Sequence, residues 1–187
     1  MKRFFSLVMF AFLFTLNACG DSFRDPRDDQ SYKVVKIGNQ VWLAENLNVE
    51  MEGSFCYADK PENCKKYGRL YTWDAAMKAC PSGWHLPSKA EFETLFNDVG
   101  GKSTAGAKLK STNGWNEGAG ADSYGFTALP AGRKYNGNYY NEGGGADFWS
   151  STVYHSYSAY FAYLGSGRQG VGTANNSYGF SVRCIKD

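Results

Sequence analysis

The sequence has little net charge and no basic run, which excludes one large class of functions. It contains 20 Lys and Arg residues against 18 Asp and Glu. Lys2 and Arg3 lie in the leader described below, and without them 18 basic residues face 18 acidic ones. Such a chain lacks the electrostatic footprint of a DNA- or RNA-binding protein. We therefore expect no nucleic-acid partner.

Residues that serve metal and nucleophile chemistry are also scarce. No CxxC pair occurs and the two histidines, His85 and His155, stand far apart, which disfavours a zinc site. No G-x-S-x-G segment occurs, and no carboxylate can be assigned to orient a histidine in a Ser-His-Asp site. We interpret His85, which precedes a predicted helix start, as a structural hydrogen-bonding residue. We predict no enzymatic activity, no catalytic residue and no cofactor.

Large rings and glycine, by contrast, are abundant. The 187 residues are 43% hydrophobic and 20% charged, which suits one globular domain and excludes a disordered chain, a collagen and a coiled coil. They include 22 Gly, 13 Tyr, 13 Phe and 5 Trp. This composition predicts many turns and a core built on aromatic rings.

The chain begins with a segment that resembles a bacterial lipoprotein signal. Lys2 and Arg3 precede an apolar run of 13 residues, 4–16, which is too short to span a membrane core of about 20 residues. Residues 16–19 read Leu-Asn-Ala-Cys, a lipobox-like motif in which the thiol of Cys19 receives diacylglycerol before cleavage. An ordinary signal peptide with a chance cysteine is the alternative. By resemblance to sorting signals, Gly20 favours the outer membrane of a bacterial envelope.

Four cysteines follow the lipobox, and an even number in an exported chain predicts disulfides. Cys56, Cys64, Cys80 and Cys184 allow three pairings. We favour Cys56–Cys64, which closes a short loop containing turn-forming residues. The second bond is then Cys80–Cys184, which ties the middle of the chain to its end.

Hydrophobic patterning predicts two helices and several short strands, hence an α+β fold with antiparallel sheets. Residues 70–79 are one helix candidate, and 88–99 begin with a Ser88–Glu91 capping box followed by a single apolar face. Residues 32–37 and 40–44 flank Gly-Asn and predict a β-hairpin. Further strand candidates are 126–133, 138–140, 148–152, 159–164, 169–173 and 178–185.

Six segments in order resemble one known family. They read VKIGNQVWLAENL, YGRLYTW, ACPSGWHLPS, GFTALPAG, FWSST and VRCI, at residues 35–47, 67–73, 79–88, 125–132, 148–152 and 182–185. This pattern is similar to the Fibrobacter succinogenes major paralogous domain over about residues 34–186. That family is similar in turn to C-type-lectin-like and formylglycine-generating sulfatase-modifying domains. The resemblance implies a compact α+β fold whose first and last segments pair, and an envelope or secreted address in Fibrobacteres and Bacteroidetes.

The resemblance does not extend to the residues with which these related families bind sugar or catalyse their reaction. C-type lectins bind sugar through calcium held by a Glu-Pro-Asn or Gln-Pro-Asp loop and a Trp-Asn-Asp strand, and this sequence has neither. Asp122, Glu142 and Asp147 are the candidates for a calcium ion, and solvated loop charge is the alternative that we favour. A formylglycine-type enzyme needs a reactive cysteine pair, whereas Cys184 stands alone near the C-terminal end and is expected in a disulfide.

Tyrosines and polar loop residues gather in the glycine-rich half and predict a binding surface within residues 133–177. Tyrosine supplies rigid, amphipathic contact area, and Asn and Gly supply adaptable hydrogen bonds. Flat rings also suit the faces of sugars, although β-sheet core and cross-strand pairing are the alternative. The candidate ligand-binding residues are Arg133, Tyr135, Tyr139, Tyr140, Trp149, His155, Tyr157, Arg168 and Asn175.

These features predict three segments. Residues 1–18 are a lipoprotein signal peptide, 19–31 a lipidated N-terminus with a flexible tether, and 32–187 a disulfide-bonded, C-type-lectin-like domain with two helices. We predict a cell-envelope lipoprotein, held to the membrane by its lipid, with a non-enzymatic binding or adhesion domain. Its expected partner is a polysaccharide or an envelope protein. A structural or protein-contact module without a small ligand is the alternative, and an enzyme related to formylglycine-generating domains comes third.

Overall fold

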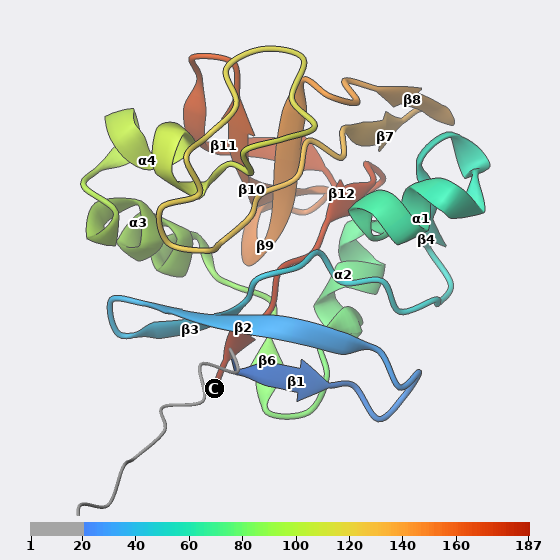
Figure 1. Ribbon diagram of the computed structural model, residues 1–187. Coiled ribbons are helices and arrows are strands. Elements are labelled where there is room, and N and C mark those ends of the chain that lie inside the picture. The colour runs from blue at the N-terminus through green and yellow to red at the C-terminus, as the bar shows by residue number, and fades with distance from the viewer. Residues whose placement is uncertain (1–20) are drawn as a thin grey trace, which may run out of the picture.

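Two main β-sheets, a β-hairpin and four helices make up residues 21–187, the part of the chain that the computed structural model describes (Figure 1). The predicted α+β class is confirmed, although two helices were expected. The predicted signal peptide and Cys19 lie outside the described residues. No helix in the described part combines the length and the apolar character needed to cross a membrane.

The first sheet joins the beginning of the described chain to its end. Its strand order is β1-β2-β3-β13-β6, and each neighbouring pair is antiparallel. The predicted hairpin is present as β2 and β3, and the C-terminal β13 pairs directly with β3. The strands are β1 (Ser22–Arg24), β2 (Ser31–Ile37), β3 (Gln40–Leu43), β6 (Trp84–His85) and β13 (Ile185–Lys186).

Part of the expected tether belongs to this sheet, so the prediction of a flexible segment is wrong for residues 21–31. β1 pairs with β2, and the ring of Phe23 lies 5.4 Å from that of Trp84. Asp25 is fully buried, and its Oδ2 accepts a hydrogen bond of 2.6 Å from Arg27. Two ion pairs within the segment, the exposed Arg24–Asp29 pair and the pair of Arg27 with the buried Asp25, account for part of its polar character.

The second sheet has the order β11-β10-β9-β12-β5-β4, and its β9–β12 pair is parallel while the other pairs are antiparallel. β7 and β8 form a separate hairpin beside it. The strands are β4 (Ser54–Phe55), β5 (Leu70–Tyr71), β7 (Arg133–Tyr135), β8 (Asn138–Tyr140), β9 (Gly145–His155), β10 (Ser158–Gly165), β11 (Gln169–Asn175) and β12 (Phe180–Ser181).

The helices follow their local capping signals. Ser88 and Glu91 form both hydrogen bonds of the predicted capping box at the start of α3. The other predicted helix begins later than expected, because Thr72 caps it and the two residues before that cap form β5. α1 and α4 were not predicted. The helices are α1 (Pro61–Tyr67), α2 (Trp73–Ala79), α3 (Lys89–Asp98) and α4 (Lys102–Leu109), with a 3-10 turn η1 (Tyr57–Asp59) before α1.

Two predicted strands differ in the structure. Residues 126–133 form no strand except at the start of β7, because the carbonyls of Phe126 and Thr127 accept hydrogen bonds from the side chain of Arg183. Thr127 also has a φ of 51°, in the left-handed region. The segment 178–185 contributes β12 to the second sheet and β13 to the first, with three residues crossing between them.

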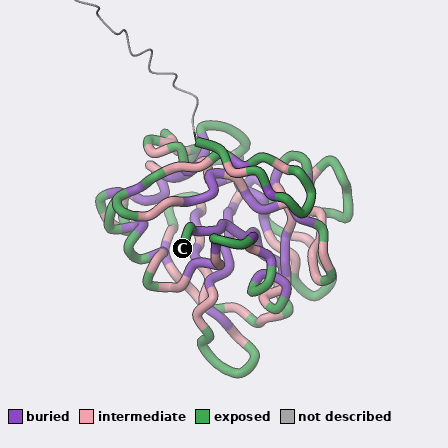
Figure 2. The backbone as a smooth tube through the Cα atoms, turned by 90° about the horizontal axis from the view of Figure 1, so that it is seen from below, coloured by how far each residue is buried: buried purple, intermediate pink, exposed green. Residues whose placement is uncertain are grey.

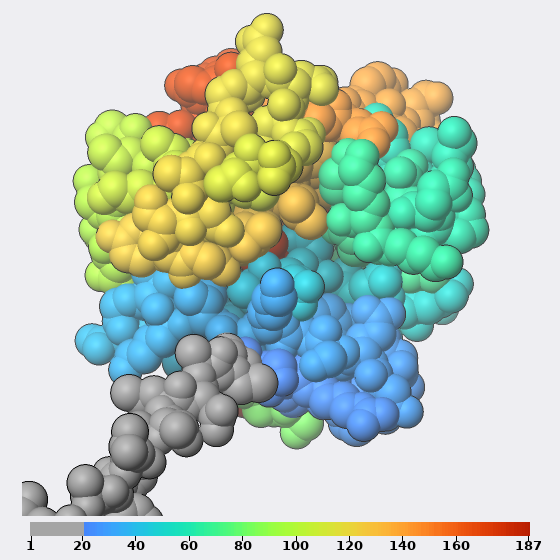
Figure 3. All heavy atoms as spheres, viewed as in Figure 1, coloured from blue at the N-terminus to red at the C-terminus, as the bar shows by residue number. Residues whose placement is uncertain are grey.

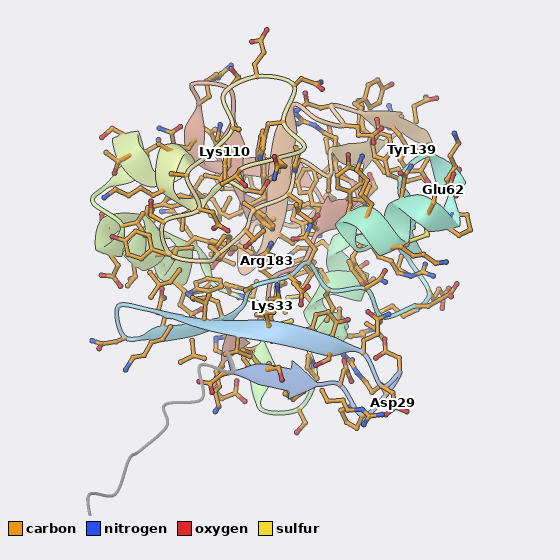
Figure 4. The ribbon with its side chains drawn as sticks, in the orientation of Figure 1. Asp29, Lys33, Glu62, Lys110, Tyr139 and Arg183 are labelled. Atoms are coloured by element: carbon orange, nitrogen blue, oxygen red, sulfur yellow. A yellow bond between two sulfur atoms is a disulfide. The ribbon has the colours of Figure 1, made fainter. Side chains whose placement is uncertain are left out.

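The guanidinium of Arg183 lies fully buried at the centre of the domain, between the two sheets (Figure 4). Its Nε donates 2.6 Å to Asn46 Oδ1, its Nη2 donates 2.8 Å to the carbonyl of Thr127, and its Nη1 donates to that of Phe126. The Asn46 amide donates onward to the carbonyl of Tyr67 at 2.7 Å. Burial lowers the pKa of Arg183 to about 9, which leaves it charged at neutral pH.

Both predicted disulfides are present. Cys56–Cys64 joins the start of η1 to α1, and Cys80–Cys184 joins the end of α2 to the crossing between β12 and β13, with sequence separations of 8 and 104. The second bond lies in the core, because Cys184 is fully buried. Figure 2 shows that buried segments (purple) run through the interior and exposed ones (green) form the outer loops.

We expect the two disulfides to differ in their contribution to stability. Replacing Cys80 and Cys184 together by alanine should lower the free energy of unfolding by about 4–5 kcal/mol, and replacing Cys56 and Cys64 by about 2.5 kcal/mol, because the longer loop constrains the unfolded chain more. Urea unfolding of the two double variants measures this difference. Equal losses, or a peptide map with another pairing, would contradict the prediction.

Candidate functional site

Two cavities of about 470 Å³ and about 550 Å³ open at one end of the domain and share Arg133 and Asn141 in their walls. We call them together the β7 cleft. Figure 1 places β7, β8 and the β10–β11 turn at the top, whereas β1 and the C-terminus lie at the bottom. In Figure 3 the segment between α4 and β7 (yellow) rises over the same top end. The other lining residues used below are Asp147, Phe161, Tyr163 and Arg168 in the first cavity and Tyr135, Tyr140 and Tyr178 in the second.

Close backbone packing shapes the floor of the cleft. β9 begins at Gly145, where an added Cβ would lie only 2.3 Å from Nδ2 of Asn141. At Gly132, just before β7, the φ is 67° and a Cβ would lie 2.4 Å from the carbonyl oxygen of Tyr140. Glycine therefore lets the hairpin approach the start of β9 and leaves room for the Asn141 amide in the wall.

Asp147 is the buried charge of the cleft. It lies on β9 opposite Tyr163 of β10 and is 3% exposed. Its Oδ2 forms an ion pair with Nε of Arg133 at 3.3 Å, yet this oxygen accepts no hydrogen bond from any residue of the described chain. Burial raises the pKa of Asp147 to about 6, and the charge of Arg133 opposes that shift. A buried carboxylate with unused acceptor capacity is costly for folding and is typical of a site that binds or reacts.

Three tyrosines form an aromatic wall in the second cavity. The ring centroids of Tyr135 and Tyr178 lie 4.4 Å apart, and those of Tyr135 and Tyr140 6.4 Å apart. Tyr140 is 46% exposed and Tyr135 37%. Each ring offers an apolar face and a hydroxyl, so this wall can pack against a ligand with both kinds of surface.

Cations surround the other side of the cleft. Arg168 is exposed on the β10–β11 turn, and Arg133 stands at the start of β7. Lys110 lies behind that turn (Figure 4): its Nζ donates 3.2 Å to the carbonyl of Gly165 and also donates to that of Gly118. Lys110 is 4% exposed, and burial lowers its pKa.

The structure brings four of the nine predicted ligand-binding residues to the cleft, namely Arg133, Tyr135, Tyr140 and Arg168. The prediction for Trp149 is wrong. This ring is fully buried, donates 2.7 Å from Nε1 to the carbonyl of Tyr71 and packs 4.4 Å from the ring of Phe180. Trp149 is therefore part of the core.

The other predicted residues lie elsewhere on the domain. The cleft is at the Gly145 end of β9, whereas His155 is at the opposite end, where Ser158 pairs with both His155 and Asn175. Tyr157 lies on the exposed turn between His155 and Ser158. None of these three residues lines either cavity of the cleft.

Tyr139 belongs to the hairpin but lies on the side that faces η1 (Figure 4). Its hydroxyl donates to Asp59, and its ring centroid lies 5.2 Å from that of Tyr57. Tyr139 therefore packs against η1 and lines neither cavity of the cleft.

The three candidate calcium ligands do not form a common site. The carboxylate of Asp122 accepts 2.7 Å hydrogen bonds from the backbone N and the Oγ1 of Thr127. Glu142 lies 3.8 Å from Lys66, and Asp147 lines the cleft. Among residues 21–187, no three acidic, histidine or cysteine side chains gather as metal ligands would.

His85 has the structural role that was predicted for it. Nδ1 lies 2.7 Å from Asp187, and Nε2 lies 2.9 Å from Glu91 of the capping box. Burial opposes protonation of the ring, but these two hydrogen bonds outweigh it and raise the pKa of His85. The histidine thereby ties the C-terminus to the start of α3.

The sequence analysis considered Asp147 only as a calcium candidate and did not single out Tyr178 or Lys110. One signal was available for the first of these: the segment Gly-Ala-Asp-Phe-Trp-Ser is buried throughout in β9, and a carboxylate inside such a run needs a reason. The contact of Tyr178 with Tyr135 and that of Lys110 with Gly165 join segments far apart in sequence, so no local pattern could show them.

The raised pKa of Asp147 predicts a pH-dependent cost to stability. Between about pH 4 and pH 6 the unfolded chain ionises this carboxyl while the folded chain keeps it protonated, so rising pH favours the unfolded state. Asp147→Asn removes this effect. Its free energy of unfolding, relative to wild type, should rise by about 2–3 kcal/mol between pH 4 and pH 7. Urea unfolding at four pH values measures it.

Asp25→Asn is the matched control. Asp25 is equally buried, but its hydrogen bonds with Arg27 lower its pKa. Its contribution to stability is present above the unfolded pKa of about 4 and is lost only below it. The Asp25 variant should therefore show a constant difference from wild type between pH 5 and pH 7. A flat profile for Asp147→Asn would contradict the prediction.

Comparison with protein families matches residues 35–186 to the Fibrobacter succinogenes major domain. Searches of curated proteins and of solved structures found no match. The matched region contains the buried Arg183 and all lining residues of the β7 cleft named above. This match covers most of the described chain. The protein is thus a member of the Fibrobacter succinogenes major domain family.

Proposed function

We propose that this protein is a lipid-anchored component of a bacterial cell envelope whose domain binds polysaccharide in the β7 cleft without catalysis. The observation that carries the proposal is the buried carboxylate of Asp147, whose Oδ2 accepts no hydrogen bond within the described chain and which lines a cavity next to exposed tyrosine rings. Sugar hydroxyls can donate to such a carboxylate and accept from Arg133 and Asn141. The apolar faces of sugar rings fit the aromatic wall.

We also propose that the fold is C-type-lectin-like. Three features support this assignment. First, β3 near the start of the family region pairs with β13 at its end. Second, the helices α2 and α3 follow β5 and β6 along the chain. Third, the Cys80–Cys184 disulfide ties the end of α2 to the C-terminal segment. The cleft then occupies the loop-rich end of the second sheet.

The placement of the cleft supports an anchored role. The described chain starts at β1, at the end of the domain opposite β7 and β8 (Figure 1). A lipid on Cys19, three residues before β1, would therefore hold the domain with its cleft directed away from the membrane. We infer an outer-membrane address from Gly20. Binding through Asp147, Arg133 and the tyrosines requires no metal ion.

A protein-contact role without a small ligand is the second candidate. It is favoured by a separate exposed apolar patch at the β9–β10 turn, where Val153 is 55%, Tyr154 46% and Tyr157 78% exposed. Exposed apolar patches of this kind often mark protein contacts. An enzyme related to formylglycine-generating domains has less support, because Cys184 is buried in a disulfide.

The proposed lipid anchor predicts that replacing Cys19 changes the cell fraction in which the protein is found. Cys19→Ser should appear in the soluble fraction, because each buried acyl CH₂ contributes about 0.8 kcal/mol to membrane binding and the variant has no acyl chain. Membrane fractionation with immunodetection measures the distribution. Ser22→Ala, just after the lipobox, is the control and should remain with the membrane. A Cys19→Ser protein that still pellets with membranes would contradict the anchor.

Polysaccharide binding is tested with the purified full chain in detergent against a panel of neutral and acidic polysaccharides, with calcium and with chelator. We expect saturable, chelator-insensitive binding to at least one of them. Tyr135→Ala should weaken it at least fivefold, about 1 kcal/mol for a lost ring contact. Tyr157→Ala, at the opposite end of β9, is the matched control and should stay within twofold of wild type. Absence of binding across the panel would refute the proposed function.

A further inference from the structure

The charges around the β7 cleft are unbalanced. Arg133 and Arg168 bring two positive charges to its walls and Asp147 one negative charge, while the ammonium of Lys110 lies close by, bonded to the carbonyl of the lining residue Gly165. Nε of Arg133 lies 3.3 Å from Oδ2 of Asp147, so these two charges offset one another, although that oxygen accepts no hydrogen bond in the described chain. In the described part of the chain, no carboxylate lies within ion-pair distance of Lys110 or Arg168. A ligand that enters this cleft meets a net positive field.

Arg168 differs from every other arginine in residues 21–187. Each of the other five has an acceptor within the protein, whereas no hydrogen bond or ion pair involves the Arg168 guanidinium. The paired residues are Arg24 with Asp29, Arg27 with Asp25, Arg69 with Glu50, Arg133 with Asp147, and Arg183 with Asn46. A planar guanidinium with its donors unused fits a carboxylate, which accepts two parallel N–H bonds.

The turn that carries Arg168 is held in place rather than loosely attached. The carbonyl of Arg168 accepts a 2.7 Å hydrogen bond from the backbone N of Gly165, and the carbonyl of Gly165 in turn accepts from the buried ammonium of Lys110. The same ammonium also bonds the segment between α4 and β7 through Gly118. The wall therefore presents Arg168 from a backbone fixed on both sides, and the buried charge of Lys110 adds to the positive field.

Asp147 narrows the class of anion that would fit. A bare phosphate or sulfate would meet the Asp147 carboxylate in the cavity. An ionised carboxylate has no hydrogen-bond donor to offer such an anion and repels it. A polyhydroxy acid satisfies both groups, because its carboxylate pairs with Arg168 while its hydroxyls donate to Asp147. The aromatic wall of Tyr135, Tyr140 and Tyr178 continues the cleft beyond Asn141, with room for a neighbouring ring.

We propose, on the basis of the polysaccharide-binding function above, that the β7 cleft selects acidic sugars of the uronate class, with Arg168 binding the sugar carboxylate and Asp147 accepting its hydroxyls. The specificity arises because one cavity holds both an unpaired guanidinium for the sugar carboxylate and a carboxylate that can accept sugar hydroxyls. Binding needs no calcium, unlike sugar binding through a metal held by acidic loops.

The test compares polygalacturonate with the same polymer after methyl esterification, which removes the charge and keeps the ring hydroxyls. The full chain in detergent should bind the acid at least tenfold more tightly than the ester in titration calorimetry. Arg168→Gln should reduce this preference below threefold. Arg24→Gln, an exposed arginine on β1 far from the cleft, should keep it. Thermal unfolding of each variant verifies that it is folded.

The outcomes separate this inference from the proposed function. Equal affinity for acid and ester, with real binding, would overturn the acidic specificity and leave polysaccharide binding intact. Binding to none of the polysaccharides would overturn both. A preference for the acid that survives in Arg168→Gln would overturn the role of Arg168. Dextran sulfate bound as tightly as polygalacturonate would overturn the role of Asp147, because it would reveal a general affinity for polyanions.

Discussion

The fold depends on a buried charge, the guanidinium of Arg183, which must find acceptors from several parts of the chain at once. It obtains them from Asn46 after β3 and from the carbonyls of Phe126 and Thr127, and it stacks over the ring of Phe126 at 4.6 Å. A buried cation without such partners would cost several kcal/mol. The requirement fixes the crossing of the chain from β12 to β13, and this crossing holds the two sheets together.

The position of the cleft follows from the same contacts. The segment whose carbonyls bind Arg183 continues to Ala128, which bridges to Lys110 at the end of α4. Lys110 in turn holds the β10–β11 turn through the carbonyl of Gly165, and that turn carries Arg168. On the other side, β12 pairs with β9 at Phe148, next to Asp147. Residues at the surface of the cleft are thus placed by polar contacts that begin in the core.

How much of this could be predicted depended on the range of the interactions. The β2–β3 hairpin, the capping box at Ser88 and both disulfides have signals within a few residues or in the cysteine count, and they were predicted. The strand expected at 126–133 fails because its carbonyls bind Arg183, 56 and 57 residues away. Trp149 and Tyr135 are both aromatic residues of the predicted binding region, and nothing in the sequence distinguishes them. Only the packing shows that Trp149 lies in the core and that Tyr135 lines the cleft.

Arg183 and Asp147 are both buried charges, and their surroundings distinguish a structural role from a binding one. The guanidinium uses its donors on protein acceptors and lies between aromatic rings, so nothing remains for a ligand. The carboxylate has one cationic neighbour, Arg133 at 3.3 Å, but its Oδ2 accepts no hydrogen bond in the described chain, and it lines a cavity. Folding alone would favour an apolar residue at position 147, because a buried unsatisfied carboxylate lowers stability. The carboxylate is therefore best explained by a ligand that donates hydrogen bonds to it.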